Sequence, residues 1–227
     1  MKWINIIFAI LAAVAVCMMT VTCASVFGNE SEVVDNIAYT IVIDAGHGGI
    51  DGGVTGVKTG VRESDLNLNI ALILETKLKE NGFTVVMTRK TKDGLYGSSG
   101  PGFKRRDMKA RREIIENAHA DLVISIHINS YVSPYRSGPQ VFFQKNAEKG
   151  KQFAEIMQKS LNKNLHCNNL FLSGDFYICR EVSVPSIIVE CGYLSNISDE
   201  EKLLKKDYRE NIANAIMEGC MGFLFVG

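Results

Sequence analysis

The sequence predicts an α/β fold: a single domain with a central twisted, largely parallel sheet flanked by helices, preceded by an N-terminal apolar leader. Short apolar runs alternate with segments in which apolar residues recur at helical spacing, which is typical of strands joined by helices. The chain has 227 residues, so without a targeting segment it suits one domain with a sizeable core. The first strand-like run stops at a glycine-rich loop, which is typical of a buried strand that ends at a functional loop.

The N-terminal segment 1–28 is predicted to be a signal peptide or a membrane anchor. No residue from Trp3 to Gly28 is charged, and the apolar run follows Lys2, as in an export signal. Thr22-Cys23-Ala24 offers an acceptable cleavage site, while the apolar length also suffices to span a bilayer. We therefore expect an exported protein, and both cleavage and retention of the leader stay open.

A short acidic linker is expected at 29–38, followed by a globular domain at 39–227. The domain opens with a predicted strand at Tyr39–Asp44. The next segment, Ser64–Asn81, has apolar residues at helical spacing and is predicted to be a helix, with Ser64 or Asp65 as its N-cap.

Strands and helices continue to alternate toward the C-terminus. Between Thr91 and Gly102 the sequence is rich in glycine and is predicted to be a surface loop. In the run Asp121–Asn129, alternate residues are apolar, and His127 shares the other face with Ser125. The remaining predicted elements are strands at Phe83–Thr88, Gln140–Gln144, Phe176–Arg180 and Ser186–Glu190, and helices at Lys104–Asn117, Asn146–Leu165 and Asp207–Phe223.

Composition argues against two classes of protein. Lysine plus arginine equals aspartate plus glutamate, 25 of each, so no global basic field attracts nucleic acid and no nucleic-acid partner is expected. The domain has four cysteines and no CxxC pair, which argues against a structural zinc knot. Buried free thiols are favoured over disulfides for Cys167, Cys179, Cys191 and Cys220.

Three candidate functional residues fall at the carboxyl ends of predicted strands, where ligands of open α/β sheets gather. They are His47 after the first strand, His127 in the third and Glu190 at the end of a later one. Taken singly, His47 reads as a loop histidine, Glu63 as a carboxylate near a helix start, and His127 as a core histidine. Glu190 is less easily explained, because a carboxylate after an apolar strand loses solvation unless it is partnered.

Two other interpretations of these histidine and glycine residues are weaker. Gly46-His47-Gly48-Gly49 does not open directly into a helix, so a dinucleotide-binding fingerprint is disfavoured. His119 follows a predicted helix and His166 lies in a polar stretch, and structural roles are favoured for both.

Four segments share a recognisable pattern: Ile43–Gly49, Arg62–Leu68, Ser125–Ser130 and Val189–Asn196. In this order they resemble the signature blocks of zinc-dependent N-acetylmuramoyl-L-alanine amidases. The resemblance runs from about Thr40 to the C-terminus and implies a single α/β domain. It also implies one Zn²⁺ per chain, with His47, Glu63 and His127 as metal ligands and Glu190 as the catalytic acid/base.

The leader-plus-domain arrangement and the motifs are most similar to the germination-specific branch of that family. The resemblance implies hydrolysis of the amide bond between the lactyl group of muramic acid and L-alanine. The expected substrate is spore cortex peptidoglycan, in which this cleavage prepares the formation of muramic-δ-lactam needed for germination. The expected location is the outer face of a membrane or the wall space, in the forespore or cortex compartment. Expected partners are peptidoglycan, the membrane if the leader is retained, and a protein that assists localisation or assembly of the zinc site.

Two alternatives stay open at this point. A zinc peptidase that cleaves within stem peptides would use the same ligand set. A non-catalytic zinc-binding scaffold for wall proteins would also keep the metal, although Glu190 argues against it because a scaffold needs no general base.

Overall fold

Six strands form one sheet: β1 (Thr40–Ala45), β2 (Thr84–Met87), β3 (Leu122–Asn129), β4 (Gln140–Gln144), β5 (Leu172–Gly174) and β6 (Ser186–Tyr193). A computed structural model describes residues 39–226, so the leader expected at 1–28 and the linker expected at 29–38 lie outside the described residues. The strand order is β2-β1-β3-β6-β4-β5. All neighbouring pairs are parallel except β4 and β6, which confirms the largely parallel α/β sheet.

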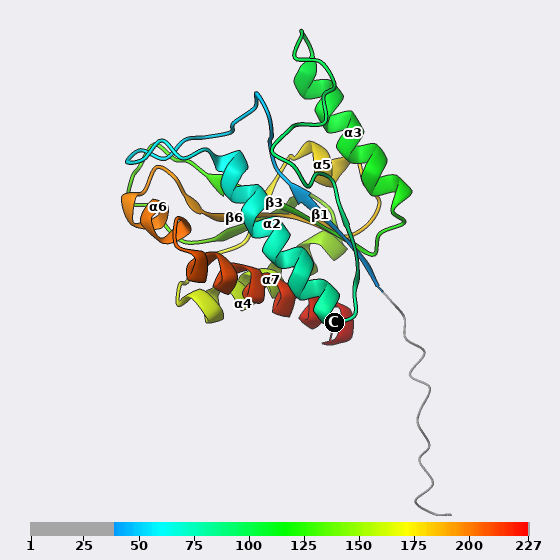
Figure 1. Cartoon of the computed structure of the whole chain (residues 1–227). Helices are drawn as coiled ribbons and strands as arrows, with labels where there is room; N and C mark the ends of the chain where they lie inside the picture. Colours follow the sequence, from blue (N-terminus) through cyan, green and yellow to red (C-terminus); the bar gives the residue numbers. More distant parts are fainter. Residues whose placement is uncertain (1–38, 227) are drawn as a thin grey trace, which may run out of the picture. The chain divides into compact units, whose positions relative to one another are not determined.

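Within residues 39–226, six helices surround the sheet: α2 (Glu63–Glu80), α3 (Phe103–Asn117), α4 (Glu148–Leu165), α5 (Tyr177–Arg180), α6 (Ile197–Leu203) and α7 (Lys206–Val226). Figure 1 shows α2, α4 and α7 on one side of the sheet and α3 and α5 on the other. The two faces carry separate hydrophobic clusters, a larger one beneath α2, α4 and α7 and a smaller one beneath α3 and α5.

The alternation of side chains along the central strands assigns residues to these two clusters. On β3, Ile124 and Ile126 belong to the larger cluster, whereas Val123 belongs to the smaller one. β1 and β6 alternate in the same way, because Ile43 and Val189 pack on the larger cluster. The alternation predicted for β3 is therefore confirmed, and the face that carries His127 is the face with the smaller cluster.

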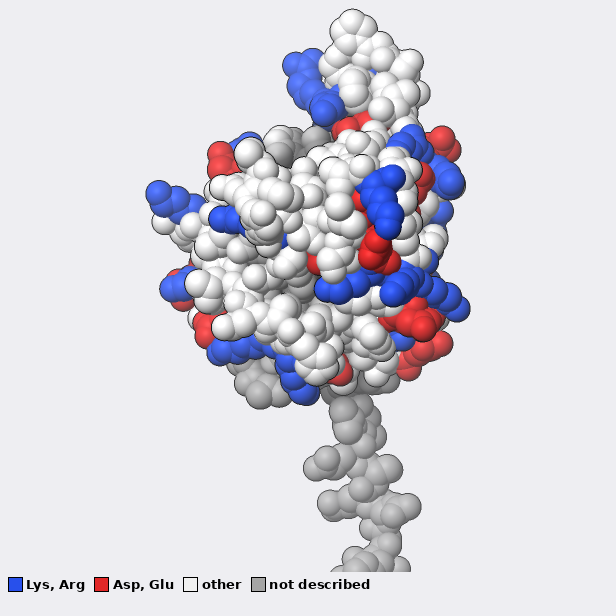
Figure 2. Space-filling model, turned by 90° about the vertical axis from the view of Figure 1, so that its left-hand side faces the viewer, with Lys and Arg blue, Asp and Glu red and all other residues white. Residues whose placement is uncertain are grey.

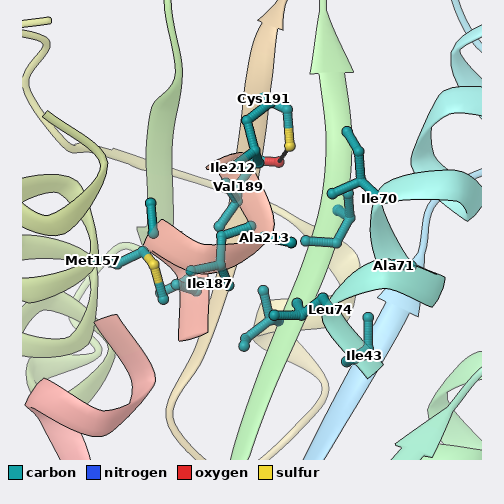
Figure 3. Close-up of a cluster of buried hydrophobic side chains, with 14 of the residues drawn as sticks. Ile43, Ile70, Ala71, Leu74, Met157, Ile187, Val189, Cys191, Ile212 and Ala213 are labelled. Atoms are coloured by element: carbon teal, nitrogen blue, oxygen red, sulfur yellow. Dashed lines mark hydrogen bonds between the residues drawn. The ribbon is translucent and has the colours of Figure 1, made fainter. Parts of the chain in front are cut away.

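The larger cluster joins segments that are far apart in sequence. Figure 3 shows Ile70 and Leu74 of α2 packed toward strand residues, with Ile212 of α7 and Met157 of α4 completing the cluster. All four side chains are fully buried. At about 25 cal/mol per Å², burial of such side chains is the main stabilising contribution, and it fixes α2 against the sheet.

Two elements differ from the sequence prediction. The prediction of a strand at Phe176–Arg180 is wrong. Residues Tyr177–Arg180 form the single helical turn α5, with Ile178 and Cys179 buried in the smaller cluster. A short apolar run does not distinguish a strand from a turn of helix. The strand at this edge of the sheet is instead the three-residue β5. The sequence did not predict helix α6, whose N-cap is Asn196: its side-chain oxygen accepts a hydrogen bond from Asp199 N at 2.9 Å.

The four cysteines of the domain are free, as expected. Cys179, Cys191 and Cys220 are buried, whereas Cys167 is half-buried. Among the helices of residues 39–226, none combines the length and apolar character that a membrane span requires.

Candidate active site

The site lies where β1, β3 and β6 end, on the sheet face that carries the smaller cluster. The strand register sets Asp44 beside Ser125 and, further along, His127 beside Glu190. Each of these strands changes from apolar to polar residues toward its carboxyl end. The parallel arrangement therefore collects chemically active side chains at one edge, as the sequence predicted.

Three of the predicted residues converge on a single carboxylate oxygen. His47 Nε2 lies 3.3 Å and His127 Nδ1 2.9 Å from Glu63 Oε1. The two imidazole rings meet edge-on, with centroids 5.0 Å apart and planes at 77°. Among residues 39–226 these side chains form one group whose ligand atoms all lie within 4.8 Å of one another.

Glu63 is held more firmly than its neighbours because it is 3% exposed and is the first residue of α2. Its Oε2 accepts a hydrogen bond from Val54 N at 2.9 Å, and its Oε1 accepts from Ile128 N at 3.2 Å. The helix therefore starts earlier than predicted: Ser64 and Asp65 are not the cap, and Arg62 takes the N-cap position without a side-chain hydrogen bond.

The electrostatics of this cluster couple the carboxylate to the imidazoles. Burial opposes the charge of Glu63, but the hydrogen bonds and charges of His127 and His47 outweigh it and hold the pKa of Glu63 well below its ordinary value. For His47, burial lowers the pKa, whereas Glu63 and Asp51 raise it, and the net shift is upward. Asp51 Oδ2 lies 3.1 Å from His47 Nδ1 and so orients the ring that faces Glu63.

The loop that carries His47 is tightly folded against β3. His47 itself has φ 60°, a left-handed conformation that is uncommon for a residue with a Cβ. A Cβ on Gly46 would come within 2.3 Å of the His127 ring, so only glycine permits this approach. The Gly46-His47-Gly48-Gly49 segment is therefore shaped to bring one imidazole next to the other.

Two buried arginines, which the sequence interpretation did not single out, brace this loop through its carbonyl oxygens. Arg111 of α3 is 1% exposed and donates to Asp44 Oδ1 and Ala45 O, both at 2.7 Å, and to His47 O at 2.6 Å. Arg89 donates to Ala45 O at 2.8 Å and to Gly46 O at 2.9 Å. In sequence, Arg111 looks like one more cation of a basic surface helix, and only the fold reveals its partner Asp44.

Glu190 lies on the other side of the cluster and contrasts with Glu63. Its Oε2 is buried and has no hydrogen-bond partner in the described part of the chain. Burial raises the pKa of Glu190 to about 7, with His127 and His47 opposing the shift and Glu63 adding to it. A carboxyl whose buried oxygen has no fixed partner is free to gain and release a proton.

Two hollows flank the site. A cavity of about 180 Å³ is lined in part by His47, His127 and Phe176. A larger groove of about 460 Å³ lies on the β4 side and is lined in part by Gln140 and Tyr193. His119 and His166, for which structural roles were favoured, lie just after α3 and α4 and do not join the cluster.

The donor set of the cluster fits a zinc ion. Two imidazole nitrogens and one carboxylate oxygen are typical zinc ligands, with bonds of about 2 Å and one position left for substrate or water. The unpartnered Glu190 Oε2 and the two carboxylates, Asp51 and Glu63, that lie beside the His47 ring agree with a cation at this site.

Comparison with known proteins decides the family, since residues 41–221 match the N-acetylmuramoyl-L-alanine amidase family model. The chain belongs to this family. It is 32% identical over 188 residues to the germination-specific N-acetylmuramoyl-L-alanine amidase of Bacillus subtilis, covering 81% of this chain and 78% of the relative. The resemblance drawn from the four sequence segments is thereby confirmed, and the chain is an amidase hydrolase.

Solved structures agree in fold. The CwlD amidase of Clostridioides difficile, determined in complex with the GerS lipoprotein, superposes with a TM-score of 0.79 at 33% identity over 83% of this chain and 100% of that chain. The catalytic domain of CwlV from Bacillus (Paenibacillus) polymyxa var. colistinus gives a TM-score of 0.73 at 32% identity, covering 83% of this chain and 99% of that one. Both amidases therefore share the fold of this chain, including the sheet at whose edge the candidate site lies.

Proposed function

We propose that this amidase is zinc-dependent and acts on spore cortex peptidoglycan, at the amide bond between the lactyl group of muramic acid and L-alanine. The observation that carries the proposal is the convergence of His47, Glu63 and His127 with Glu190 as cross-strand neighbour of His127. The similarity to a germination-specific amidase supports the cortex assignment.

Each of the four residues has a role in this proposal. His47, Glu63 and His127 hold one Zn²⁺ per chain, with Glu63 as the buried anionic ligand between the two imidazoles. When bound, zinc supplies Lewis acidity, which activates water near neutral pH and stabilises negative charge on a carbonyl oxygen. Glu190 accepts the proton of the attacking water and delivers it to the leaving nitrogen of L-alanine.

The proposal extends to the rest of the chain. Residues 1–28 serve as a signal peptide or membrane anchor, 29–38 as a linker and 39–227 as the catalytic domain, so that the enzyme works outside the membrane in the cortex compartment. Because the CwlD amidase was determined in complex with a lipoprotein, we propose a lipoprotein partner for this chain as well.

The deciding experiment combines metal content with product analysis. The purified full chain, incubated with peptidoglycan, is expected to contain one zinc per chain and to release stem peptides that begin with L-alanine. Glu190→Gln is expected to keep the zinc and lose about 10³-fold in kcat, since a general acid/base contributes roughly 10²–10⁴. Full turnover by this variant would contradict the role of Glu190.

The same products separate the alternatives. Cleavage within the stem peptide, without a new N-terminal L-alanine, would favour a zinc peptidase, and zinc without hydrolysis in the presence of a lipoprotein partner would favour a scaffold. In a spore-former, deletion of the gene is expected to remove muramic-δ-lactam from the cortex. Spores with normal muramic-δ-lactam would contradict the cortex role and leave the amidase assignment intact.

A further inference from the structure

A groove next to Glu190 takes no part in holding the metal cluster. We call it the Gln140 groove; six of the residues that line it are Tyr135, Arg136, Gln140, Asn169, Leu170 and Tyr193. Because β4 runs antiparallel to β6, its first residue, Gln140, pairs with Glu190. Directly opposed residues of this kind have Cβ atoms about 5 Å apart, so the groove begins beside the proposed acid/base.

The inner wall of the groove is fixed by hydrogen bonds. Gln140 Oε1 accepts from the Tyr193 hydroxyl at 2.7 Å, and Gln140 Nε2 donates to Leu170 O at 2.9 Å. Gln140 is 8% exposed and its amide has partners at both ends. The wall therefore stays in place whether or not a ligand is present.

The loop between β3 and β4, residues 130–139, forms the outer wall and is anchored to the segment that precedes and begins α6. Tyr131 N donates to Ser195 Oγ at 3.0 Å, and Asn196 Nδ2 donates to Pro134 O at 2.7 Å. Gly138 N donates to the buried Asp199 Oδ2 at 2.7 Å. The loop is thus preorganised along its length, which lowers the entropic cost of binding a ligand.

Arg136 is the one cation among the residues that line the groove, and none of them is acidic. Its guanidinium carbon lies 4.1 Å from the centroid of the Tyr131 ring, a cation–π contact that directs the side chain. Within residues 39–226 it forms no ion pair with a carboxylate. Figure 2, which views the side of α6, shows lysine and arginine scattered around a broad uncharged area. The guanidinium of Arg136 is therefore the one positive charge that a ligand in the groove would meet.

We propose that the Gln140 groove binds the stem peptide of the substrate and that Arg136 pairs with the free α-carboxylate of its D-glutamate. This inference rests on the proposed function. D-glutamate is the second residue after the scissile bond, so its carboxylate lies at most about 7 Å from the leaving nitrogen, at ~3.5 Å per residue. That reach agrees with a groove that starts beside Glu190.

Charge favours the peptide over the glycan as the occupant. In the intact substrate the lactyl carboxyl is tied up in the scissile amide, so the sugar side of the bond carries no carboxylate there. The peptide side carries free carboxylates, which a guanidinium binds with charge-assisted, often bidentate hydrogen bonds. A groove with one cation and no acid complements the peptide.

The test uses two N-acetylmuramoyl tripeptides that are identical except at the D-glutamate α-position, which is a carboxylate in one and a carboxamide in the other. For the full chain with zinc, we expect a kcat/KM about tenfold higher on the carboxylate, as one charge-assisted hydrogen bond provides. Arg136→Gln is expected to raise KM for the carboxylate substrate about tenfold, to leave kcat unchanged, and to leave the carboxamide substrate unaffected. Arg136→Lys is expected to restore part of the preference.

Lys145→Gln provides the matched control, because Lys145 is exposed, follows the opposite end of β4 and is expected to leave both substrates unchanged. Equal KM values for the two substrates in the wild type, or an equal effect of Arg136→Gln on both, would overturn the groove assignment while the amidase stands. If the wild type released stem peptides from peptidoglycan but hydrolysed neither tripeptide, the groove assignment alone would fail; if it released none from peptidoglycan either, the proposed function would fail as well.

Discussion

The two sides of the site are built differently. On the His47 side, Glu63 accepts backbone and side-chain hydrogen bonds, and Arg111 and Arg89 hold the carbonyls of the loop. On the other side, Glu190 is half-buried, and its buried oxygen Oε2 has no hydrogen-bond partner within residues 39–226. The contrast fits two tasks: metal ligands need a fixed geometry, whereas an acid/base group must hold and release a proton without breaking the structure around it.

The sharpest test of this contrast compares Glu63→Gln with Glu190→Gln. Both changes replace a carboxylate by an amide of the same shape, and both are expected to remove most activity, by about 10³-fold or more. Only Glu63→Gln should also lower zinc affinity, by about 100-fold or more, and destabilise the metal-free protein by about 2 kcal/mol, because an NH₂ group then faces backbone N–H donors.

Zinc titration and denaturant unfolding of the two metal-free variants measure these effects. Glu80→Gln, at the exposed end of the same helix as Glu63, is the matched control and should change neither property. An equal loss of stability in both active-site variants would remove the distinction between the two sides.

A second prediction tests the brace of the His47 loop. Arg111→Met keeps a side chain of similar length but leaves Asp44 buried without its ion pair, which is expected to cost about 3 kcal/mol of unfolding free energy. Zinc affinity should fall as well, because His47 O loses its donor and the loop is freed. Chemical denaturation and zinc titration measure both, with Arg105→Met, an exposed neighbour on α3, as the control. Unchanged zinc affinity in Arg111→Met would show that the loop holds its shape without the brace.

The smallest expected effect is a dependence of stability on acid. Although burial opposes its charge, Arg111, Ser125 and Thr88 lower the pKa of Asp44 to about 2, below its ordinary value of 3.8. Because the folded state binds the proton less readily than the unfolded state, this contribution is present above about pH 4 and is lost as the pH falls toward 2.

Urea unfolding between pH 5 and pH 2 should therefore show the stability difference between the wild type and Asp44→Asn shrinking by about 2 kcal/mol. A difference that stays constant across this range would mean that the pKa of Asp44 is the same in the folded and the unfolded protein.

Sequence reasoning reached the parts of the molecule that local patterns encode. The alternation of β3 and the glycines after β1 predicted the strand ends, and the four family segments pointed to His47, Glu63, His127 and Glu190. It missed Arg111 because the partner, Asp44, is 67 positions away in the chain and the helix around Arg111 is strongly basic. It took α5 for a strand because four residues are too few to reveal a period.

The reversed direction of β4 has a consequence for how such enzymes diversify. Because β4 begins at the site rather than ending there, the chain must cross the catalytic edge in the 130–139 loop before it enters the strand. That loop contributes no zinc-ligand candidate, so its length and sequence can change while the metal cluster is kept. Selectivity for different forms of peptidoglycan can therefore evolve, or be engineered, by changing this loop while the catalytic residues stay the same.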